Sequence, residues 1–269
     1  MVIRKVNEVR ALLLAAGLGT RLSPLTDKWP KCLMPIDKRP LLEYWLETLY
    51  STNVREVLVN LHHHSEIVQE FLNRHRFKNW VSSVSEENLL GTAGTLQKNW
   101  QYFKDSTTLL IHSDNWCQCD FGSFLKYHIL ERPAHTVMTM MVFNSEYPKA
   151  SGIVELDDNN IVAHFTEKPS HPKSNLANGA VYILEPEVIE SLGRGQTVVD
   201  FSTEVIPKYM GRIATWKNNN IHRDIGVIEE LKAAQSDPKP DICWTNHDSW
   251  SVRYRSNSVV RELESLAHE

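Results

Sequence analysis

The chain contains a small glycine-bearing loop that reads LAAGLGTRLSPLT over residues 14–26 and continues as PKCLMPI over residues 30–36. An apolar run at residues 11–16 leads directly into this loop, which carries Arg21 and, ten residues later, Lys31. Glycines allow backbone N–H groups to approach an anion, and cationic side chains neutralise its charge. The segment therefore predicts a phosphate-binding loop that follows a buried strand.

Apolar and amphipathic segments alternate through the first half of the chain. This pattern predicts a β-α-β-α order and an α/β fold with a mostly parallel sheet covered by helices on both faces. Ligands of such a sheet bind at the carboxyl ends of its strands. We expect strands at residues 11–16, 54–61, 81–85 and 107–112, and helices at residues 41–50, 65–74 and 121–130 and after Gly94.

The second half is richer in strands, which predicts a mixed sheet. Acidic and amide residues at 157–160 are typical of a hairpin turn between two of these strands. We expect strands at residues 136–143, 152–156, 161–167, 177–184 and 213–217, and helices at residues 185–192, 201–210 and 229–235.

A polar segment with two prolines at residues 236–241 is typical of a linker. We therefore expect one catalytic domain over residues 1–235 and a separate segment over residues 236–269. The end of that segment is amphipathic, and the sequence leaves open whether it packs on the core or on another subunit. Whether the chain forms a homo-oligomer is equally open.

The bulk composition is that of an ordinary globular enzyme, with 42% hydrophobic and 23% charged residues among 269. A net charge of −4 argues against nucleic acid as a partner, because binding its phosphate backbone relies on a basic surface. The longest apolar runs fall short of the ~20 residues of a membrane span, and the N-terminus lacks the apolar region of a signal peptide. We therefore expect no membrane partner. Four cysteines do not suggest a disulfide framework, so we expect the protein to lie in the reducing cytoplasm.

Further motifs follow the ends of expected strands. The sequence reads ENLLGTAG over residues 87–94, HSDN over residues 112–115, EKP over residues 167–169, NG over residues 178–179 and HRDIG over residues 222–226.

These motifs and the glycine loop together resemble the signature of the sugar-phosphate nucleotidyltransferases, and the resemblance extends from about residue 11 to about residue 231. It implies a Rossmann-like, three-layer α/β/α fold with a small β region on the sugar side. It also implies a reaction in which a nucleoside triphosphate and a sugar 1-phosphate give a nucleotide-sugar and pyrophosphate. The attacking phosphate oxygen is already anionic at pH 7, so positioning and charge neutralisation have to carry the catalysis.

The resemblance also implies roles for individual residues. The implied catalytic residues are Arg21, Lys31, Asp114 and Lys168. The implied nucleotide-binding residues are Ala15, Ala16, Gly17, Gly19, Thr20, Arg21, Glu87, Gly91 and Thr92, the glycines of residues 91–94 allowing the base to approach the backbone. The implied sugar-binding residues are Glu167, Lys168, Asn178 and Gly179. Asp114 and Asp224 are the implied ligands of Mg²⁺, the expected cofactor.

Three positions depart from the family pattern, and one of them is Val227, which follows Gly226 where a threonine is common. Ser113 replaces a glycine next to Asp114, and His222 replaces a tryptophan two residues before Asp224.

The reaction that the resemblance favours is guanylyl transfer from GTP to mannose 1-phosphate or a related sugar, for polysaccharide biosynthesis. Uridylyl, thymidylyl or cytidylyl transfer, and a non-catalytic nucleotide-sugar-binding homologue, remain alternatives.

Two clusters of potential metal ligands are interpreted as ordinary side chains. The three consecutive histidines at residues 62–64 follow a strand end, and neighbouring residues of an extended chain point in opposite directions. Cys117 and Cys119 lack the spacing of a zinc site and a second pair of ligands.

Overall fold

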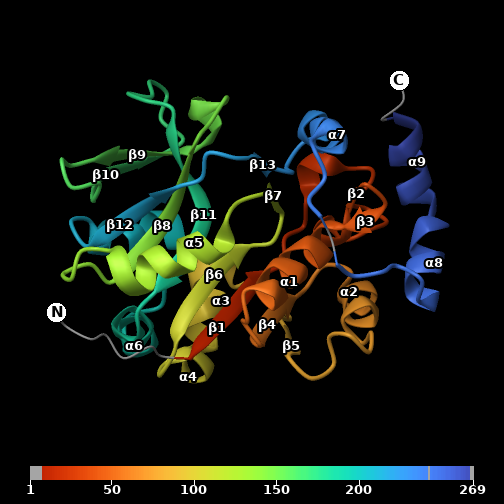
Figure 1. The fold of residues 1–269 in the computed structure, drawn as a ribbon, viewed down its shortest axis with the longest axis horizontal. Helices are drawn as coiled ribbons and strands as arrows, with labels where there is room; N and C mark the ends of the chain where they lie inside the picture. The colour runs from red at the N-terminus through yellow and green to blue at the C-terminus, as the bar shows by residue number, and fades with distance from the viewer. Residues whose placement is uncertain (1–7, 242, 267–269) are drawn as a thin grey trace. The chain divides into compact units, whose positions relative to one another are not determined.

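The computed structural model describes residues 8–241 and 243–266, which divide into two compact units (Figure 1). The strands β1 (Val9–Leu14) and β6 (Thr107–His112) belong partly to each unit. Unit 1 comprises the described residues up to Leu12 and residues 90–111 and 119–220, and unit 2 comprises residues 13–89, residues 112–118 and the described residues from Ile221 onward.

Unit 1 is organised around β11, a nine-residue strand that is buried along most of its length. Its strands lie in the order β10-β9-β11-β6-β1, and β8 pairs with both β11 and β12. Strand β11 is antiparallel to β6, β8 and β9, whereas β12 and β8 are parallel. The strands of this unit, besides β1 and β6, are β8 (Met138–Asn144), β9 (Gly152–Leu156), β10 (Val162–Glu167), β11 (Leu176–Leu184) and β12 (Ile213–Lys217), and its helices are α3 (Gly91–Lys98), α4 (Trp100–Phe103), α5 (Phe121–Lys126) and α6 (Pro186–Arg194).

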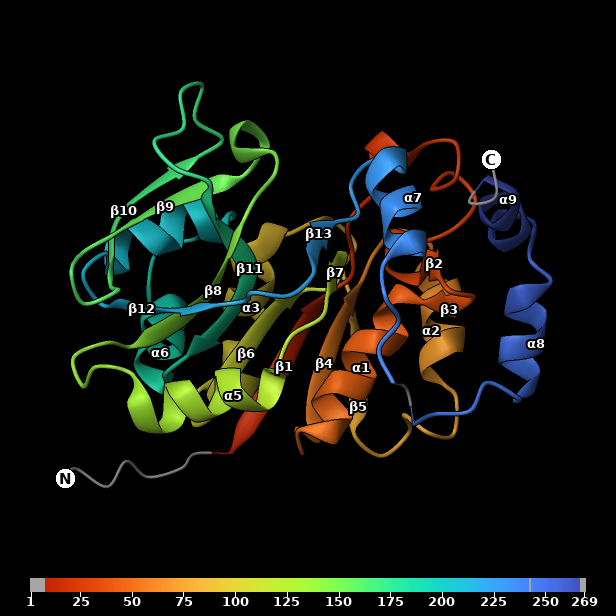
Figure 2. The same ribbon diagram turned by 45° about the horizontal axis from the view of Figure 1, so that its top comes forward.

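In unit 2 the order is β1-β4-β5, and β4 and β5 are parallel. Helix α2 packs on both strands (Figure 2). Two small antiparallel sheets, β2-β3 and β7-β13, complete this unit. Its elements are β2 (Pro35–Ile36), β3 (Arg39–Pro40), α1 (Leu41–Ser51), β4 (Glu56–Leu61), α2 (Ser65–Leu72), β5 (Val81–Ser85), β7 (Asn115–Cys117), β13 (His222–Asp224), α7 (Ile228–Ser236), α8 (Ser249–Arg255) and α9 (Ser258–Leu266).

The strands form a nine-stranded mixed sheet with flanking helices, so the predicted α/β class is confirmed. Residues 11–13 of β1 are fully buried, as expected of a strand covered on both faces. The strands expected at residues 81–85, 107–112, 152–156 and 213–217 have the predicted bounds. The turn expected at residues 157–160 is also present, and the carboxylate of Asp157 accepts N–H bonds from Asn159 and Ile161.

Three expected helices differ from the prediction. The helix expected after Gly94 begins at Gly91, and the one expected over residues 121–130 changes at Tyr127 into a wider π-type turn. Residues 201–210 form no α-helix: a π-type turn, Phe201–Val205, is followed by a 3-10 turn, Ile206–Tyr209. Pro207 explains this difference, because proline supplies no N–H group and prevents regular α-helical bonding.

The amphipathic end of the chain is helical as the pattern suggests, and Val259 and Leu263 of α9 are buried in unit 2. The shorter helix before it, α8, was not predicted from the sequence. Among the described residues, the structure holds no helix that is long and apolar enough to cross a bilayer.

Candidate functional site

The glycine loop begins at a buried polar pair that the sequence did not predict. The N–H of Ala15 donates to Oδ1 of Asn60 over 2.7 Å, and Nδ2 of Asn60 donates to Oε1 of Glu86 over 3.1 Å. Both side chains are buried. Because a buried polar group is costly unless it is hydrogen-bonded, this pair fixes where the loop leaves β1. The one signal in the sequence is a lone asparagine within the otherwise apolar end of β4.

The two glycines of this loop have different roles. Gly19 adopts a left-handed φ of 65°, and a Cβ there would lie 2.7 Å from Cγ2 of Thr26. The hydroxyl of Thr26 also donates to the carbonyl of Gly19 over 2.9 Å. At Gly17, by contrast, no atom lies within 4 Å of a Cβ position. Gly19 therefore shapes the loop, whereas the Cβ position of Gly17 borders open space.

The histidine run supports the same loop. Nε2 of His63 and Nε2 of His64 lie 2.9 and 3.0 Å from the carbonyl oxygen of Thr26. A carbonyl only accepts hydrogen bonds, so each ring nitrogen that bonds to it acts as the donor. Through Thr26 the two rings hold the chain that packs against Gly19.

Four charged residues of unit 2 converge from separate segments: Arg21, Lys31, Asp114 and Asp224. They are here called the nucleotide-side cluster, because the resemblance assigns them to the nucleotide and its metal ion. Nζ of Lys31 lies 2.6 Å from Oδ2 of Asp114 and 3.3 Å from Oδ1 of Asp224. Nη2 of Arg21 lies 3.4 Å from Oδ2 of Asp224. The side chain of Lys31 is only 8% exposed, whereas Arg21 and Asp224 are exposed. The cluster therefore combines one buried cation with an open outer side.

Short backbone elements bring the two aspartates together. Asp114 follows β6, and Asp224 ends β13, which pairs with β7 so that Asp224 lies opposite Asn115. The N–H of Ile225 also donates to the carbonyl of Asp114. At Gly226 a Cβ would lie 2.6 Å from Nη2 of Arg21 and 2.9 Å from Oδ2 of Asp224. Glycine at this position leaves room for the guanidinium group.

The charges of the cluster stabilise one another. Burial by itself would lower the pKa of Lys31, but Asp114 and Asp224 outweigh it and raise that pKa above its ordinary value. Burial would likewise raise the pKa of Asp114, but Lys31 and then His112 more than offset this and lower it. At neutral pH, Lys31 is therefore a cation and Asp114 an anion.

The departure from the family pattern at Ser113 does not introduce a side chain at the surface. Ser113 is fully buried, and its hydroxyl donates to the carbonyl of Leu14 at the end of β1 over 2.7 Å. The second departure, His222, lies opposite Cys117 in the β7-β13 pair. All four cysteines are free thiols, and those at 117 and 119 are half-buried.

The donor set of the cluster fits a magnesium ion. Two carboxylates, of Asp114 and Asp224, reach one ammonium group, so both lie within reach of a single cation. Mg²⁺ commonly takes one or two protein carboxylates and completes its shell with phosphate oxygens and water. Among residues 8–241 and 243–266, no three or more His, Cys, Asp or Glu side chains lie together in an arrangement that could hold a metal ion.

The segment of residues 87–94 spans the boundary between the units. Glu87 is exposed in unit 2, whereas Gly91 and Thr92 begin α3 in unit 1. Gly91 has a left-handed φ of 77°, and a Cβ there would lie 2.4 Å from the carbonyl oxygen of Val199. Close packing of that carbonyl on the start of α3 therefore accounts for glycine at this position.

The start of α3 bonds to the same segment. The N–H of Ala93 donates to the carbonyl of Val199 over 2.9 Å, and the hydroxyl of Thr92 accepts the N–H of Phe201 over 2.8 Å. The first turn of the helix is thus already engaged by residues of unit 1.

The sugar-binding candidates lie in unit 1. Glu167 ends β10 opposite Gly152, where a Cβ would lie 2.8 Å from Oε2 of Glu167. Lys168 has a left-handed φ of 45° and brings Nζ within 3.7 Å of Oε1 of Glu167. Burial raises the pKa of Glu167, the charge of Lys168 partly offsets this, and the charge of Asp200 adds to it. A left-handed lysine is costly and is often found at functional sites.

Asn178 shapes the strand on which it lies. Its Nδ2 donates to the hydroxyl of Tyr182 over 2.6 Å, and its Oδ1 accepts the N–H of Ala180 over 3.0 Å. Ala180 has a left-handed φ of 53°, and the pairing of β11 with β8 is irregular between Asn178 and Tyr182. Asn178 and the buried Gly179 therefore belong to a bulge in β11.

The sequence of this chain is similar to those of known nucleotidyl transferases. The family model described as nucleotidyl transferase matches residues 10–239. A UTP–glucose-1-phosphate uridylyltransferase of Synechocystis sp. is 32% identical over 74% of this chain and 55% of its own length. A putative mannose-1-phosphate guanyltransferase of Sulfolobus acidocaldarius is 28% identical over 81% of this chain and 60% of its own length. The chain thus spans between about half and two thirds of the length of these relatives.

Solved structures show the same fold. A putative glucose-1-phosphate thymidylyltransferase of Bacillus anthracis superimposes with a TM-score of 0.77 at 18% identity, covering 85% of this chain and 94% of that one. HddC of Yersinia pseudotuberculosis, in complex with GMP-PN, has a TM-score of 0.70 at 22% identity and covers 84% of this chain and 97% of its own. The family match extends over most of the sequence and includes the segments that supply the nucleotide-side cluster. The chain therefore belongs to the nucleotidyl transferase family.

Proposed function

We propose that the protein transfers a nucleoside monophosphate from a nucleoside triphosphate to a sugar 1-phosphate and releases pyrophosphate. The observation that carries this proposal is the convergence of the Asp114 and Asp224 carboxylates within 3.3 Å of the Lys31 ammonium group. A site that brings two polyanions together needs cations for the phosphates and carboxylates for a metal ion. This cluster supplies both.

In this reaction an oxygen of the sugar phosphate attacks the α-phosphorus of the nucleotide. The new P–O bond forms as the bond to the β-phosphate breaks, and pyrophosphate leaves with the electron pair. No proton has to be removed, because the attacking oxygen is already ionised. Lys31 neutralises charge at the α-phosphate, and Arg21 binds the outer phosphates from the exposed side of the cluster.

Asp114 and Asp224 are the residues that would hold Mg²⁺. When bound, the ion neutralises phosphate charge during the displacement. The backbone at Gly17 offers an open surface for the nucleotide, and Ala15, Ala16, Gly19 and Thr20 continue the same loop. We assign Glu87, Gly91 and Thr92 to the nucleotide as well.

The sugar phosphate is assigned to a second set of residues, the sugar-binding candidates of unit 1: Glu167, Lys168, Asn178 and Gly179. Glu167, whose pKa is raised, accepts hydrogen bonds from sugar hydroxyls, and Lys168 neutralises the sugar phosphate. Asn178 and Gly179 supply the neighbouring strand surface.

The proposed specific reaction is guanylyl transfer from GTP to mannose 1-phosphate or a related sugar. In its favour, relatives from Sulfolobus acidocaldarius and Drosophila melanogaster are named mannose-1-phosphate guanylyltransferases, at 28% and 31% identity. The uridylyltransferase of Synechocystis sp. is of similar identity, so uridylyl transfer is the runner-up. We place this activity in the cytoplasm, as a step of nucleotide-sugar synthesis for polysaccharides.

Pyrophosphate release tests the proposal. The full chain is incubated with Mg²⁺, one of GTP, UTP, dTTP or CTP, and a panel of sugar 1-phosphates. Release with one sugar and one nucleotide is expected, together with a loss of at least 100-fold in Asp114→Asn and in Lys31→Met. Asp120→Asn is the matched control, since Asp120 caps α5 and lies outside both sets of residues. Binding of a nucleotide-sugar without any release would instead favour a non-catalytic homologue.

A further inference from the structure

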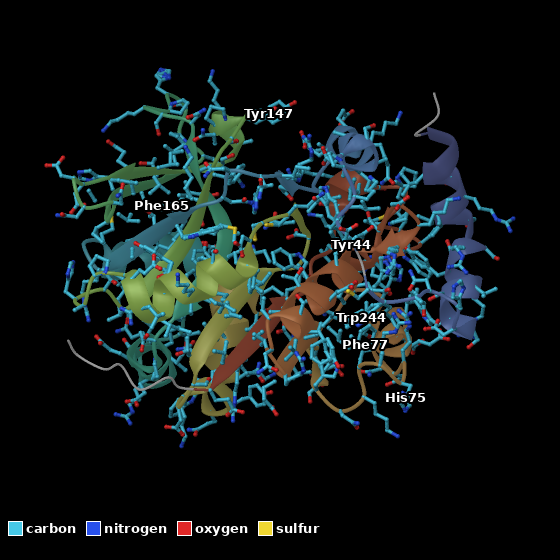
Figure 3. The ribbon with its side chains drawn as sticks, viewed as in Figure 1. Tyr44, His75, Phe77, Tyr147, Phe165 and Trp244 are labelled. Atoms are coloured by element: carbon cyan, nitrogen blue, oxygen red, sulfur yellow. The ribbon has the colours of Figure 1, made fainter. Side chains whose placement is uncertain are left out.

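The helix pair α8–α9 follows the matched residues 10–239 and belongs to unit 2, where it packs on earlier residues of the chain. In both ribbon views α8 lies beside α2 (Figures 1 and 2). Trp250 of α8 contacts Phe71 of α2 with ring centroids 4.9 Å apart. Just before α8, Trp244 lies beside Phe77, with a centroid distance of 5.7 Å (Figure 3).

A buried ionic network anchors the start of α8. Asp248 caps the helix by accepting the N–H of Ser251 over 2.8 Å, and it also accepts Nε of Arg74 over 2.9 Å. The side chain of Arg74 is only 4% exposed, and it also bonds to Glu43 and to the hydroxyl of Ser251. Removing one partner of such a network leaves buried charge uncompensated, so α8 is held in a defined position.

From this position α8 reaches the turn that carries Lys31. The hydroxyl of Tyr254 donates to the carbonyl of Leu33 over 2.8 Å, and Nε1 of Trp29 donates to the same carbonyl over 3.0 Å. Leu33 is the last residue of the 3-10 turn Lys31–Leu33. The turn is therefore fixed from the outside by a residue of the C-terminal helix pair.

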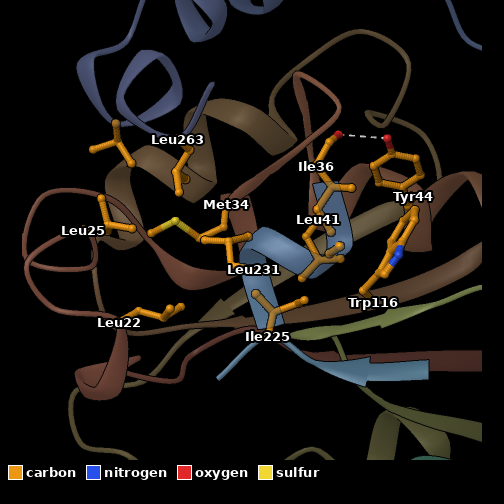
Figure 4. Close-up of a cluster of buried hydrophobic side chains, with 12 residues drawn as sticks. Leu22, Leu25, Met34, Ile36, Leu41, Tyr44, Trp116, Ile225, Leu231 and Leu263 are labelled. Carbon is orange, nitrogen blue, oxygen red and sulfur yellow. Dashed lines mark hydrogen bonds between the residues drawn. The ribbon is translucent and has the colours of Figure 1, made fainter. Parts of the chain in front are cut away.

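Helix α9 shares a buried hydrophobic cluster with the segment on either side of this turn. Val259 and Leu263 belong to one buried cluster with Leu22, Leu25 and Met34 (Figure 4). Leu22 follows Arg21 directly, and Met34 follows the Lys31 turn. The two cationic residues of the nucleotide-side cluster thus lie on a segment whose apolar side chains share one buried cluster with α9.

We propose that α8–α9 is a positioning element for the nucleotide-side cluster and that Tyr254 is a positioning residue for Lys31, acting through the carbonyl of Leu33. The inference rests on the proposed function, because it takes Lys31 to contact the nucleotide phosphates. A lysine side chain is long and flexible, so the position of its charge depends on how precisely the turn that carries it is held. An error of about 1 Å at a reacting group costs on the order of 100-fold in rate.

A double-mutant cycle in the full-length protein tests this inference. The dissociation constants of Mg²⁺–GTP and Mg²⁺–UTP are measured by calorimetry, without sugar phosphate, so that no turnover occurs. Tyr254→Phe is expected to raise the dissociation constant of the preferred nucleotide by about 3- to 10-fold, the scale of one hydrogen bond. In the Lys31→Met background the same substitution is expected to have no further effect, since the group through which it acts is gone.

Tyr44→Phe is the matched control. The hydroxyl of Tyr44 donates to the carbonyl of Ile36 over 2.9 Å within the same buried cluster, but Ile36 lies outside the Lys31 turn (Figure 4). Both substitutions remove one buried hydrogen bond and should lower stability similarly in urea, while only Tyr254→Phe weakens nucleotide binding. The inference is overturned if Tyr254→Phe and Tyr44→Phe weaken binding equally, or if the effect of Tyr254→Phe persists in full beside Lys31→Met. If Lys31→Met itself leaves binding unchanged, the assignment of Lys31 in the proposed function fails, and the inference fails with it.

Discussion

The nearly buried ammonium of Lys31 bonds to the carboxylates of both Asp114 and Asp224. Lys31→Met removes this charge and leaves Asp114 and Asp224 to repel each other. We expect the free energy of unfolding to fall by about 1–3 kcal/mol without Mg²⁺, and part of the loss to return when Mg²⁺ is added. Urea unfolding with and without Mg²⁺ measures both effects. Lys28→Met, at an exposed position of the same loop, should change neither, and an equal loss in both variants would contradict the prediction.

At Gly226 the space taken up by a side chain matters, whereas the backbone conformation does not require glycine. A Cβ at this position meets the far end of the flexible Arg21 side chain, and the φ of Gly226 is not left-handed. Gly226→Ala should therefore displace the guanidinium from Asp224 and change the unfolding free energy by less than about 1 kcal/mol. Steady-state kinetics should show a raised KM for the nucleoside triphosphate. An unchanged KM would mean that Arg21 does not contact the nucleotide from this position.

The sequence singled out four charged residues that the structure brings together, but few of the contacts that hold them. Arg21, Lys31, Asp114 and Asp224 were singled out because the short motifs that carry them resemble those of the sugar-phosphate nucleotidyltransferases. The Asn60–Glu86 pair was not found, because both residues act through partners that are distant in the chain. For the same reason the contacts of His63 and His64 with the carbonyl of Thr26 were not predicted and required the structure.

At the scale of elements, the start of α3 depends on Gly91. Gly91→Ala would place a Cβ against the carbonyl of Val199 in a left-handed conformation, so we expect a loss of about 2–4 kcal/mol. Gly94→Ala is the comparison, because a Cβ there lies 3.1 Å from the carbonyl of Val198 without a left-handed φ. Its cost should be about 1 kcal/mol or less, since the helix interior itself favours alanine over glycine. Thermal unfolding ranks the two variants, and equal midpoints would contradict the role assigned to Gly91.

The start of α8 depends on the charge of Asp248. Burial would raise the pKa of this carboxyl, but the N–H of Ser251 and the guanidinium of Arg74 outweigh it and lower the pKa. A lowered pKa means that the stabilisation is complete above the unfolded value of about 3.9 and is lost as the pH falls through the folded value. Asp248→Asn should therefore cost about 1–2 kcal/mol at pH 7 and progressively less below pH 4.

Urea unfolding from pH 7 to pH 3 measures this difference. Asp241→Asn is the control, because Asp241 is exposed in the segment before α8. If the difference in unfolding free energy between Asp248→Asn and the unchanged protein stays constant over this range, the charge of the carboxylate is not its cause.

At the scale of the whole molecule, the hydrophobic periodicity predicted the order of most strands and helices correctly. The short pairs β2-β3 and β7-β13 were not predicted, since strands of two or three residues carry too little pattern to recognise. The C-terminal segment shows a second limit of prediction from sequence patterns. Its composition marks a linker and an amphipathic end, but burial of Trp250, Tyr254 and Leu263 against unit 2 depends on partners more than 150 residues away in the chain.

Deleting residues 240–269 tests whether residues 1–235 form a domain without this segment. The deletion uncovers Leu25 and Met34 and leaves Arg74 with Glu43 but without Asp248. We expect a lower urea midpoint, and an m-value reduced by about a tenth, because 30 of 269 residues and the surface they bury are removed. Nucleotide affinity should fall at least as far as in Tyr254→Phe, since the donor to Leu33 is lost with the helix pair. A truncated chain that keeps its midpoint and its affinity for Mg²⁺–nucleotide would show instead that residues 1–239 are a self-sufficient domain.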